Sequence, residues 1–328
     1  MQTINLENKR VLYIGPVRFQ YDQELIKRMS LLGADVEAFG QYPDTLNFKI
    51  LKKLKLPSLK KYLEDFYNKA LVKGNKDYVL IRHGHMLPVS FLERLKKNNP
   101  NARFINFHWD SLKPAYNYLP VIKYFDKVYS FDYKDARENP GVHYLPLFYL
   151  DDYAEHKKQQ QTAKNEYDLL FIGAWRNTER LELIKQTDKI CRESQLKFVY
   201  YLHASIQWQY DYFKQNRSFP KEARSKSLSH SDILEYFSKT SCIIDFPSSF
   251  QTGLTIRTFE TLGAGKKLIT TNKNIITEPF YNPEFISIVD PENLQLDVDF
   301  INNKPQSSIE EALKDYSINS YIYKLLES

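Results

Sequence analysis

Short apolar runs alternate with helix-length amphipathic segments along most of the chain. The first run, 10–14, ends at Gly15 and precedes a helical pattern over 21–32, and the run at 78–82 precedes another over 88–97. This alternation predicts parallel sheets covered by helices on both faces, an α/β fold. Further strands are expected at 35–39, 104–107, 127–131, 143–148, 168–172, 196–201, 241–245 and 267–270.

The alternation stops once, at the polar segment 151–166, and then restarts. A chain of 328 residues is long enough for two domains. We therefore expect one α/β domain over 1–150, a linker over 151–166, a second α/β domain over 167–307, and a terminal helix over 308–328 that packs back on the first domain. Because ligands bind outside the carboxyl ends of parallel strands, a cleft between the two domains is the expected site.

Composition narrows the class of protein. Hydrophobic residues make up 42% and charged residues 26%, as in ordinary globular proteins. Two cysteines cannot frame a disulfide scaffold, no His/Cys cluster has zinc spacing, and no metal site is expected. The chain has no apolar run long enough to span a membrane, and its first residues lack the apolar core of a signal peptide, which predicts a cytoplasmic protein.

The net charge of +6 is concentrated in residues 49–76, which hold nine lysines and two acidic residues. A nucleic-acid-binding protein more often spreads its basic residues along a groove, so no nucleic-acid partner is expected. Leucines alternate with these lysines, and Pro57 divides the window into two short helical pieces. Two interpretations stay open: contact with an anionic membrane surface, or a basic helix whose apolar stripe packs on the first domain.

The segment 250–272 carries the most chemical information. Gly253 permits close approach of the backbone to a ligand just where a helix begins, and the N-terminus of a helix favours an anion such as phosphate. Arg257 and Glu260 are three residues apart and share one helix face. A guanidinium and a carboxylate there would suit a diphosphate and a ribose hydroxyl; the alternative is a surface ion pair on an amphipathic helix.

This segment resembles the nucleotide-sugar donor site of GT-B glycosyltransferases, in particular the group-1-like branch with spore-maturation-protein-like and surface-polysaccharide enzymes. The matching positions are Gly253, Arg257, Glu260, Leu262, Gly265, Leu268, Ile269 and Thr270. The resemblance implies two Rossmann-like domains facing a cleft, with acceptor recognition in the first domain and donor binding in the second. It implies a nucleotide-diphosphate sugar as donor substrate and neither a further cofactor nor a metal.

Position 252 departs from the family pattern. Retaining enzymes of the large branch place a glutamate eight residues before the second one, where this chain has Thr252, so the resemblance leaves the stereochemical outcome open. Gln251 and Thr252 could instead hydrogen-bond the donor sugar. The turn around Gly173 and Arg176 is a second candidate for the diphosphate, with a solvated helix end as the equally favoured alternative for Arg176. The expected donor contacts are Gly173, Arg176, Gln251, Thr252, Gly253, Leu254, Thr255, Arg257 and Glu260.

An inverting transfer needs a general base beside the acceptor hydroxyl, usually Asp, Glu or His. Asp110, His85, His108 and His83 follow or end strand-like runs of the first half. A histidine at a strand end is more often a hydrogen-bonded structural residue, so Asp110 is the preferred base, with His85 and His108 as further catalytic candidates.

The sequence therefore predicts a glycosyltransferase that moves a sugar to a glycan or lipid-linked acceptor in bacterial surface polysaccharide synthesis, such as lipopolysaccharide or capsule. A cytoplasmic protein bound peripherally to the inner face of the membrane fits this role. The alternatives are a nucleotide-sugar epimerase of the same fold and a two-lobed sugar or anion binder without catalysis. The aromatic stretch 200–219 either lines the donor sugar or packs structurally.

Overall fold

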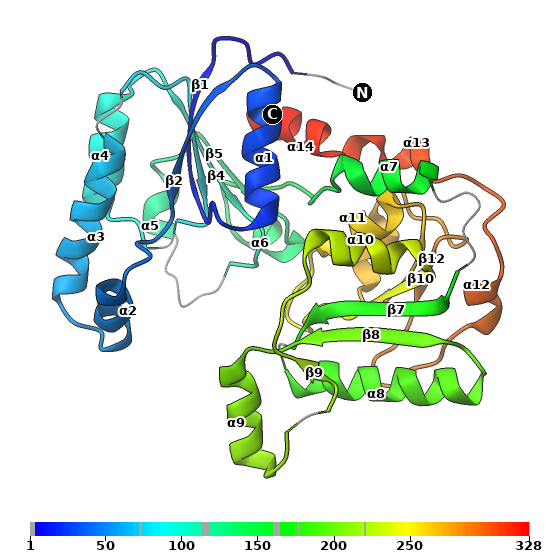
Figure 1. Cartoon of the computed structure of the whole chain (residues 1–328). Helices are drawn as coiled ribbons and strands as arrows, with labels where there is room; N and C mark the ends of the chain where they lie inside the picture. Colours follow the sequence, from blue (N-terminus) through cyan, green and yellow to red (C-terminus); the bar gives the residue numbers. More distant parts are fainter. Residues whose placement is uncertain are drawn as a thin grey trace. The chain divides into compact units, whose positions relative to one another are not determined.

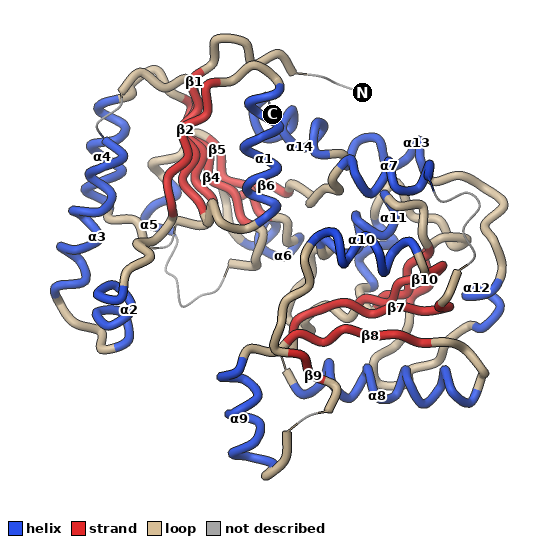
Figure 2. The backbone as a smooth tube through the Cα atoms, in the orientation of Figure 1, coloured by secondary structure: helices blue, strands red, loops and turns tan. Residues whose placement is uncertain are grey.

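The computed structural model describes residues 4–71, 74–84, 86–112, 119–159, 165–175, 177–219 and 221–327, with side chains of 119–120 and 156–159 left aside. Two compact units divide the chain: unit 1 comprises 1–146 and 318–328, and unit 2 comprises 147–317. Within the described residues each unit contains one six-stranded parallel sheet (Figures 1 and 2). The α/β class with two Rossmann-like domains, predicted from the alternating pattern, is confirmed.

Unit 1 has the strand order β2-β1-β3-β4-β5-β6. In Figure 1, α3 and α4 cover one face of this sheet, and α1 and α14 cover the other. The elements are β1 (Arg10–Gly15), α1 (Gln20–Leu31), β2 (Asp35–Gly40), α2 (Leu46–Lys53), α3 (Ser58–Asn68), η1 (Lys69–Leu71), β3 (Tyr78–Arg82), α4 (Val89–Asn98), β4 (Arg103–His108), α5 (Leu119–Ile122), β5 (Lys127–Ser130), α6 (Tyr133–Glu138), β6 (Val142–Tyr144) and α14 (Ile318–Glu327).

Alternation along the strands of unit 1 separates two layers of the core. Leu12 and Ile14 of β1 pack with Phe91 of α4 and Tyr67 of α3. Tyr13 points the other way, where its hydroxyl donates to Asp22 of α1. Each large apolar side chain that is fully buried contributes about 1.5–3 kcal/mol to stability, so these layers fix the helices on the sheet.

A buried polar cluster lies on the α1 side of the unit 1 sheet. Asp22 is fully buried, accepts from the Tyr13 hydroxyl and forms an ion pair with Arg82 at the end of β3. The Trp109 ring lies 4.0 Å from the Arg82 guanidinium carbon, and its indole N–H donates to the Tyr321 hydroxyl of α14 at 2.8 Å. Burial raises the pKa of Asp22 although Arg82 opposes the shift.

Unit 2 has the order β12-β11-β10-β7-β8-β9. Helix α8 covers one face of its sheet, and α10 and α11 cover the other (Figure 1). The elements are α7 (Asp151–Gln159), β7 (Tyr167–Ala174), α8 (Thr178–Glu193), β8 (Phe198–His203), α9 (Ile206–Asn216), β9 (Ala223–Arg224), α10 (His230–Ser238), β10 (Thr240–Asp245), α11 (Ile256–Gly263), β11 (Lys267–Thr270), η3 (Lys273–Thr277), β12 (Ile286–Ile288), α12 (Val298–Asn302), α13 (Glu310–Leu313) and η4 (Lys314–Tyr316).

Two predicted segments differ from the structure. Where a linker was expected over 151–166, residues 151–159 form α7, and its fully buried Tyr153 anchors the helix in unit 2. The polar composition was misleading because the contacts of α7 are tertiary: Tyr153 donates to Glu260 of α11, and Asp152 pairs with His230 of α10. The helix expected over 308–328 is broken into α13, η4 and α14, since Ser317 is extended and Tyr149 N–H donates to Tyr316 O.

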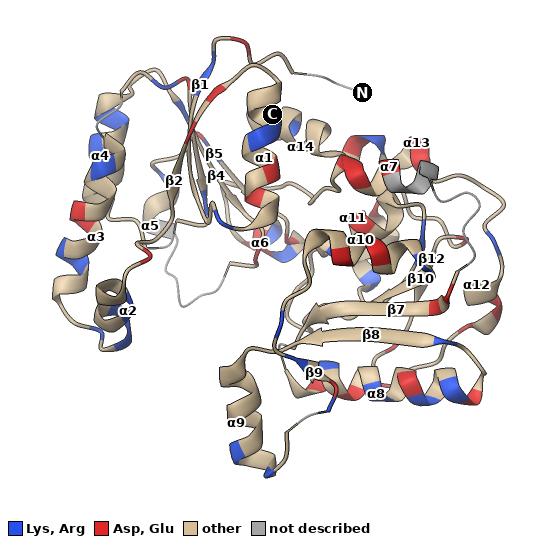
Figure 3. Cartoon of the chain, viewed as in Figure 1, with Lys and Arg blue, Asp and Glu red and all other residues tan. Residues whose placement is uncertain are grey.

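The lysine-rich window forms α2 and α3, and Pro57 stands at the boundary before α3, as predicted. Part of the apolar stripe packs on the first domain, as the second interpretation predicts. Leu63 is buried in the core, whereas Ile50, Leu54 and Leu56 are exposed. Basic residues mark α2, α3 and α4 in Figure 3, while charges of both signs alternate along α8.

Candidate functional site

The sheet of unit 2 changes its winding direction between β7 and β10, so the carboxyl ends of these strands mark its topological switch point. Gly173 lies near the end of β7, and a Cβ atom there would be 2.7 Å from the Phe171 ring. A larger residue at this position would therefore have to displace the Phe171 ring. Arg176, predicted to contact a diphosphate nearby, lies outside the described residues.

Arg180 of α8 spans the switch point. Its guanidinium donates to Ala174 O of β7 at 2.6 Å and to Phe246 O after β10. Asp245 at the end of β10 accepts from the Thr255 hydroxyl, and burial raises the pKa of Asp245 against the effect of that bond and of Arg180. Arg180 therefore joins the two strand ends, and the carboxylate beside it anchors the start of the next helix.

The loop between β10 and α11 holds most of the predicted donor contacts. Thr255 caps α11 by accepting from the Thr258 N–H. The Asn272 amide donates to Gly253 O at 3.0 Å, and Asn274 donates to Thr252 O at 3.0 Å. Gln251, expected to meet the donor sugar, directs its amide N–H to Gly253 O. Two carbonyls of this loop are thus held by side chains that follow β11, which gives the loop backbone a defined shape. Leu254 is buried beneath the loop.

Arg257 and Glu260 share one face of α11, as predicted, but they pair with each other. Arg257 Nη1 lies 2.6 Å from Glu260 Oε2, and Glu260 Oε1 accepts from the Tyr153 hydroxyl at 2.8 Å. The Arg257 guanidinium also lies 5.3 Å from the centre of the Phe237 ring. Their side chains are 12% and 3% exposed. The alternative of a solvated surface pair is therefore excluded, and the two groups form a buried cluster of α7, α10 and α11.

In unit 1, His83 and Asp110 come together beyond the carboxyl ends of β3 and β4. His83 Nε2 lies 3.5 Å from Asp110 Oδ2, and the carboxylate side chain is 69% exposed. His83 has a φ of 65°, and Gly84 after it has a φ of 80°. This left-handed turn directs the imidazole back over the strand ends. His85, the other histidine of the loop, lies outside the described residues.

Asn106 organises the two histidines of this site. Its amide nitrogen donates to Ile81 O at 2.7 Å and to His83 O at 3.1 Å, so its oxygen is the acceptor that faces His108 Nε2 at 2.6 Å. His108 Nε2 consequently carries a proton, and Nδ1 is the basic nitrogen of the neutral ring. His108 is buried, and its ring lies 5.7 Å from that of His83. His108 thus supports His83 from below.

Some contributing residues were not predicted. Asn106 has a signal in the sequence, because a polar residue interrupts the apolar run 104–107. Asn272 and Asn274 follow a predicted strand, where polar residues commonly serve a site. Tyr153 has no such signal, because it lies in a segment that was expected to be a linker. Their roles depend on contacts between distant elements.

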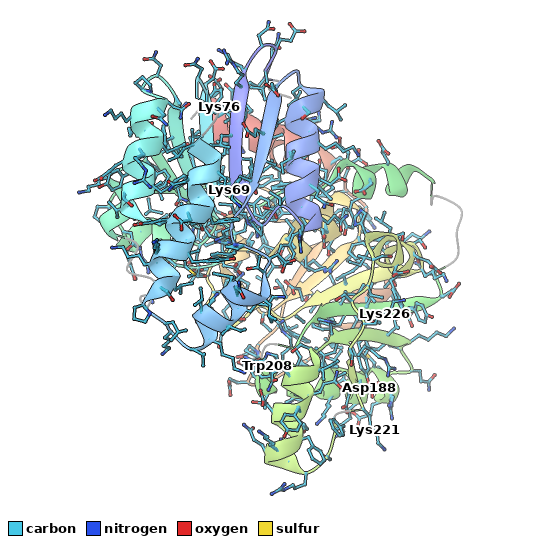
Figure 4. The ribbon with its side chains drawn as sticks, turned by 60° about the vertical axis from the view of Figure 1, so that its left-hand side comes forward. Lys69, Lys76, Asp188, Trp208, Lys221 and Lys226 are labelled. Atoms are coloured by element: carbon cyan, nitrogen blue, oxygen red, sulfur yellow. The ribbon has the colours of Figure 1, made fainter. Side chains whose placement is uncertain are left out.

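The aromatic stretch forms β8 and α9. Trp175 at the end of β7 contacts Tyr212 with ring centres 4.9 Å apart, and Trp208 at 6.5 Å. Trp208 is half-exposed; Figure 4 labels it on α9, and Lys221 on the segment that follows. The inner side of α9 therefore packs structurally. Of the two interpretations, structural packing accounts for Tyr212, which lies against the unit 2 core.

Within the described ranges, no three His, Cys, Asp or Glu side chains are grouped as metal ligands. In this part of the chain no helix is both long enough and apolar enough to cross a bilayer.

No protein-family model matches the sequence, and no curated protein matches it. Solved structures do match, over nearly the whole chain. An α-glucosyltransferase in complex with UDP and a 13-mer DNA aligns with a TM-score of 0.54 and 13% identity, covering 97% of this chain and 94% of that one. The catalytic domain of starch synthase IV from Arabidopsis thaliana, bound to ADP and acarbose, aligns with a TM-score of 0.54 and 11% identity, covering 98% and 95%.

A putative UDP-N-acetylglucosamine 2-epimerase from Listeria monocytogenes aligns with a TM-score of 0.52 and 11% identity, covering 97% of this chain and 94% of that one. At these identities the likenesses define the fold. The chain has the GT-B fold, the two-domain α/β architecture of nucleotide-sugar enzymes that include glycosyltransferases and an epimerase.

Proposed function

We propose that this protein is a glycosyltransferase that transfers a sugar from a nucleotide-diphosphate sugar to a glycan or lipid-linked acceptor. The observation that carries the proposal is the loop 251–255, which joins the carboxyl end of β10 to α11 at the switch point of the unit 2 sheet. A glycine-containing loop at a helix N-terminus is suited to bind a diphosphate through backbone N–H groups and the helix dipole. That binding would also stabilise the diphosphate as it leaves.

In this proposal Arg257 and Glu260 serve the donor from within their buried cluster. Tyr153 and Arg257 fix the Glu260 carboxylate in one orientation. In that orientation a carboxylate oxygen can still accept a further hydrogen bond, from a ribose hydroxyl, and Arg257 would add positive charge beside the diphosphate. Gly173 would flank the same end of the sheet, Arg176 stays a predicted contact of the diphosphate, and Gln251 and Thr252 would meet the donor sugar.

For the acceptor we propose the His83–Asp110 pair as the source of the general base. Asp110 is the exposed member and orients the imidazole, whose neutral form can take a proton from the acceptor hydroxyl. Asn106 and His108 hold the loop and the ring from below. This assigns Asp110 a role beside His83 instead of as the sole base, and leaves His108 as a positioning residue.

Biologically, we propose a role in bacterial surface polysaccharide synthesis, lipopolysaccharide or capsule, in the cytoplasm at the inner face of the membrane. The exposed Leu46 and Ile50 of α2, the exposed Leu54 and Leu56 that follow it, and the lysines among them support membrane contact. An epimerase of the same fold is the second candidate, since one of the similar structures is a putative epimerase.

The test begins with thermal-shift measurements against UDP, GDP, CDP and ADP and their sugars. Stabilisation by one nucleotide, lost in Arg257→Ala and Glu260→Ala but kept in the surface control Arg192→Ala, is the expected result. No stabilisation by any nucleotide would remove both the transferase and the epimerase. The active donor incubated alone and followed by NMR then separates the two, because epimerisation needs no acceptor.

The catalytic assignment is tested with the same donor and a lipid-linked or glycan acceptor. We expect His83→Gln and Asp110→Asn each to lower kcat by about 10²–10⁴-fold, the usual contribution of a general base. The matched control is His143→Gln, a histidine exposed on β6. Binding of nucleotide without any turnover would instead identify a non-catalytic binder.

A further inference from the structure

An apolar groove of about 560 Å³ lies on unit 1 between the start of α3 and the residues that lead into α4. Leu56, Leu59 and Leu63 form its α3 side, and Met86 and Val89 form the other. This volume is within the range of small-molecule sites, which are concave and mostly apolar with a few polar groups.

The mouth of the groove exposes aliphatic side chains. Leu56 is 39% exposed and Val89 is 40% exposed, although both line the apolar groove. By contrast, Leu63 on the floor is buried in the unit 1 core. The groove is therefore a formed part of a packed domain, with a mouth whose aliphatic surface would be covered by a hydrocarbon ligand.

One lysine and one glutamate line the groove, and further lysines lie close to it in the sequence. Lys60 lines it, and Lys61 and Lys55 are exposed close by in the sequence. Glu64, the acidic residue of the lining, accepts from the Ser90 hydroxyl at 3.2 Å. Lys76 takes no part, since its side chain is 6% exposed and pairs with Glu37 at 2.8 Å; Figure 4 labels it apart from Lys69 at the end of α3. Lys60, the cation in the lining, favours an anionic group at the mouth.

One loop joins this groove to the candidate base. His83 precedes Met86 by three residues, and Leu87 N–H donates to Gly84 O at 3.0 Å to form the turn between them. Pro88 and Val89 then form part of the groove wall. A chain held in the groove would therefore have its head group on the same end of the sheet as His83 and Asp110.

We propose that the groove binds the prenyl chain of an anionic lipid-linked acceptor, with its phosphate near Lys60. This inference rests on the proposed transfer to a lipid-linked acceptor, and it names the part of the molecule that selects that acceptor. A single aliphatic chain fits the apolar walls, and the phosphate satisfies the cation at the rim.

Farnesyl phosphate, a short prenyl phosphate, is the probe, and binding to the full chain is measured by calorimetry without donor. The double variant Leu56→Gln/Val89→Gln places two amides at the mouth, and we expect binding at least tenfold weaker. The matched control Leu46→Gln/Leu54→Gln changes residues that are 72% and 61% exposed and lie outside the groove. It should bind within twofold of wild type.

The anionic head is tested by comparing farnesyl phosphate with farnesol. Lys60→Gln should reduce the preference for the phosphate, whereas Lys61→Gln on the same helix should keep it. Equal loss in both variants would indicate a diffuse basic surface and would overturn the assigned phosphate position.

A measurement on the unmodified protein does not depend on the folding of any variant. The chain has three methionines, and with methyl-labelled methionine Met86 reports on the groove while Met29, buried in α1, is an internal control. We expect farnesyl phosphate to shift Met86 and leave Met29 unchanged. An unmoved Met86 overturns the proposal.

Anionic vesicles distinguish a chain-binding site from a flat membrane contact. In one outcome farnesyl phosphate does not bind, and phosphatidylglycerol vesicles sediment the groove variant and the control variant equally, both less than wild type. The segment is then a bilayer surface, and the groove proposal fails. Because these measurements need no nucleotide, their failure leaves the transferase proposal intact, and a failed nucleotide screen leaves the groove result intact.

Discussion

Each unit buries a carboxylate that accepts from a tyrosine hydroxyl and pairs with an arginine, but the two clusters are built differently. In unit 1 the cluster is Tyr13, Asp22 and Arg82, from β1, α1 and β3. In unit 2 it is Tyr153 on α7 with Glu260 and Arg257, both on α11. Both arginine side chains are 12% exposed.

Their surroundings separate their roles. The unit 1 cluster is enclosed by Trp109 and by Tyr321 of α14, so it joins the terminal helix to the sheet. The unit 2 cluster lies on the helix whose first turn follows the candidate diphosphate loop. Buried ion pairs are weak sources of net stability but are costly to break. We infer that the first cluster fixes the fold of unit 1, whereas the second fixes the orientation of groups that serve the site.

The largest expected effect is the loss of one partner in unit 1. Asp22→Ala leaves the Arg82 guanidinium buried without its carboxylate, which should cost about 3–5 kcal/mol of unfolding free energy. The matched control is Arg192→Ala, whose side chain is 78% exposed and lies 2.6 Å from Asp188. It should cost less than about 1 kcal/mol. Urea unfolding measures both, and equal losses would refute the structural role of the unit 1 cluster.

Removing a single hydroxyl compares the clusters directly. Tyr13→Phe and Tyr153→Phe each delete a hydrogen bond to a carboxylate, worth about 1.5–3 kcal/mol. Under the proposed function only Tyr153→Phe should also raise the KM for the donor, because Glu260 loses its orientation. Steady-state kinetics decide: a donor KM that rises in Tyr13→Phe and not in Tyr153→Phe would reverse the roles assigned to the clusters.

The two clusters also mark what the sequence could predict. Arg257 and Glu260 are three residues apart on one helix, so local spacing alone placed them on a common face. No such pattern links residues 13, 22 and 82, which meet only because the sheet brings three elements together. Asn272 and Asn274 could not be predicted for the same reason. They follow β11, and their amides donate to carbonyls of the loop that follows the neighbouring strand β10.

The α/β class was predictable because parallel strands are short apolar runs whose spacing survives in the sequence. The partner of Glu260 was not, because Tyr153 lies in a polar segment and its burial depends on tertiary packing. Likewise, Asp110 was predictable as a loop acid, but its pairing with His83 depends on a left-handed backbone turn after β3.

A smaller difference between the two units is expected at a sequence motif that both contain. Leu-aromatic-Ile-Gly lies at the end of β1, at 12–15, and one residue before the end of β7, at 170–173. An added Cβ would lie 2.6 Å from the Tyr13 ring in Gly15→Ala and 2.7 Å from the Phe171 ring in Gly173→Ala. Overpacking of this kind costs about 1–3 kcal/mol. Gly15→Ala should cost more, because Tyr13 is held by its hydrogen bond to Asp22.

A second substitution checks this explanation. Phe171→Leu added to Gly173→Ala should recover part of the lost thermal stability by making room, whereas Tyr13→Leu added to Gly15→Ala should not, since it breaks the unit 1 cluster. Recovery in both units would show that ring volume alone sets the cost.

The smallest expected effect is on the pH dependence of thermal stability, and it involves two carboxylates of unit 2, Asp245 and Asp232. Burial raises the pKa of Asp245 above its ordinary value of 3.8, so its contribution is present at low pH and is lost as the pH rises through the folded-state pKa. The Tm of Asp245→Asn should therefore gain on wild type between about pH 4 and pH 7, each unit of raised pKa corresponding to about 1.4 kcal/mol.

Hydrogen bonds from Ser229 lower the pKa of the exposed Asp232, so its contribution is lost as the pH falls. Asp232→Asn should hence lose stability relative to wild type as the pH rises from the acid range to about pH 5, above which the difference should level off. The difference in Tm between variant and wild type should therefore rise with pH for Asp245→Asn and fall with pH for Asp232→Asn. The two signs differ because burial raises the pKa of a carboxylate, whereas helix-capping hydrogen bonds lower it.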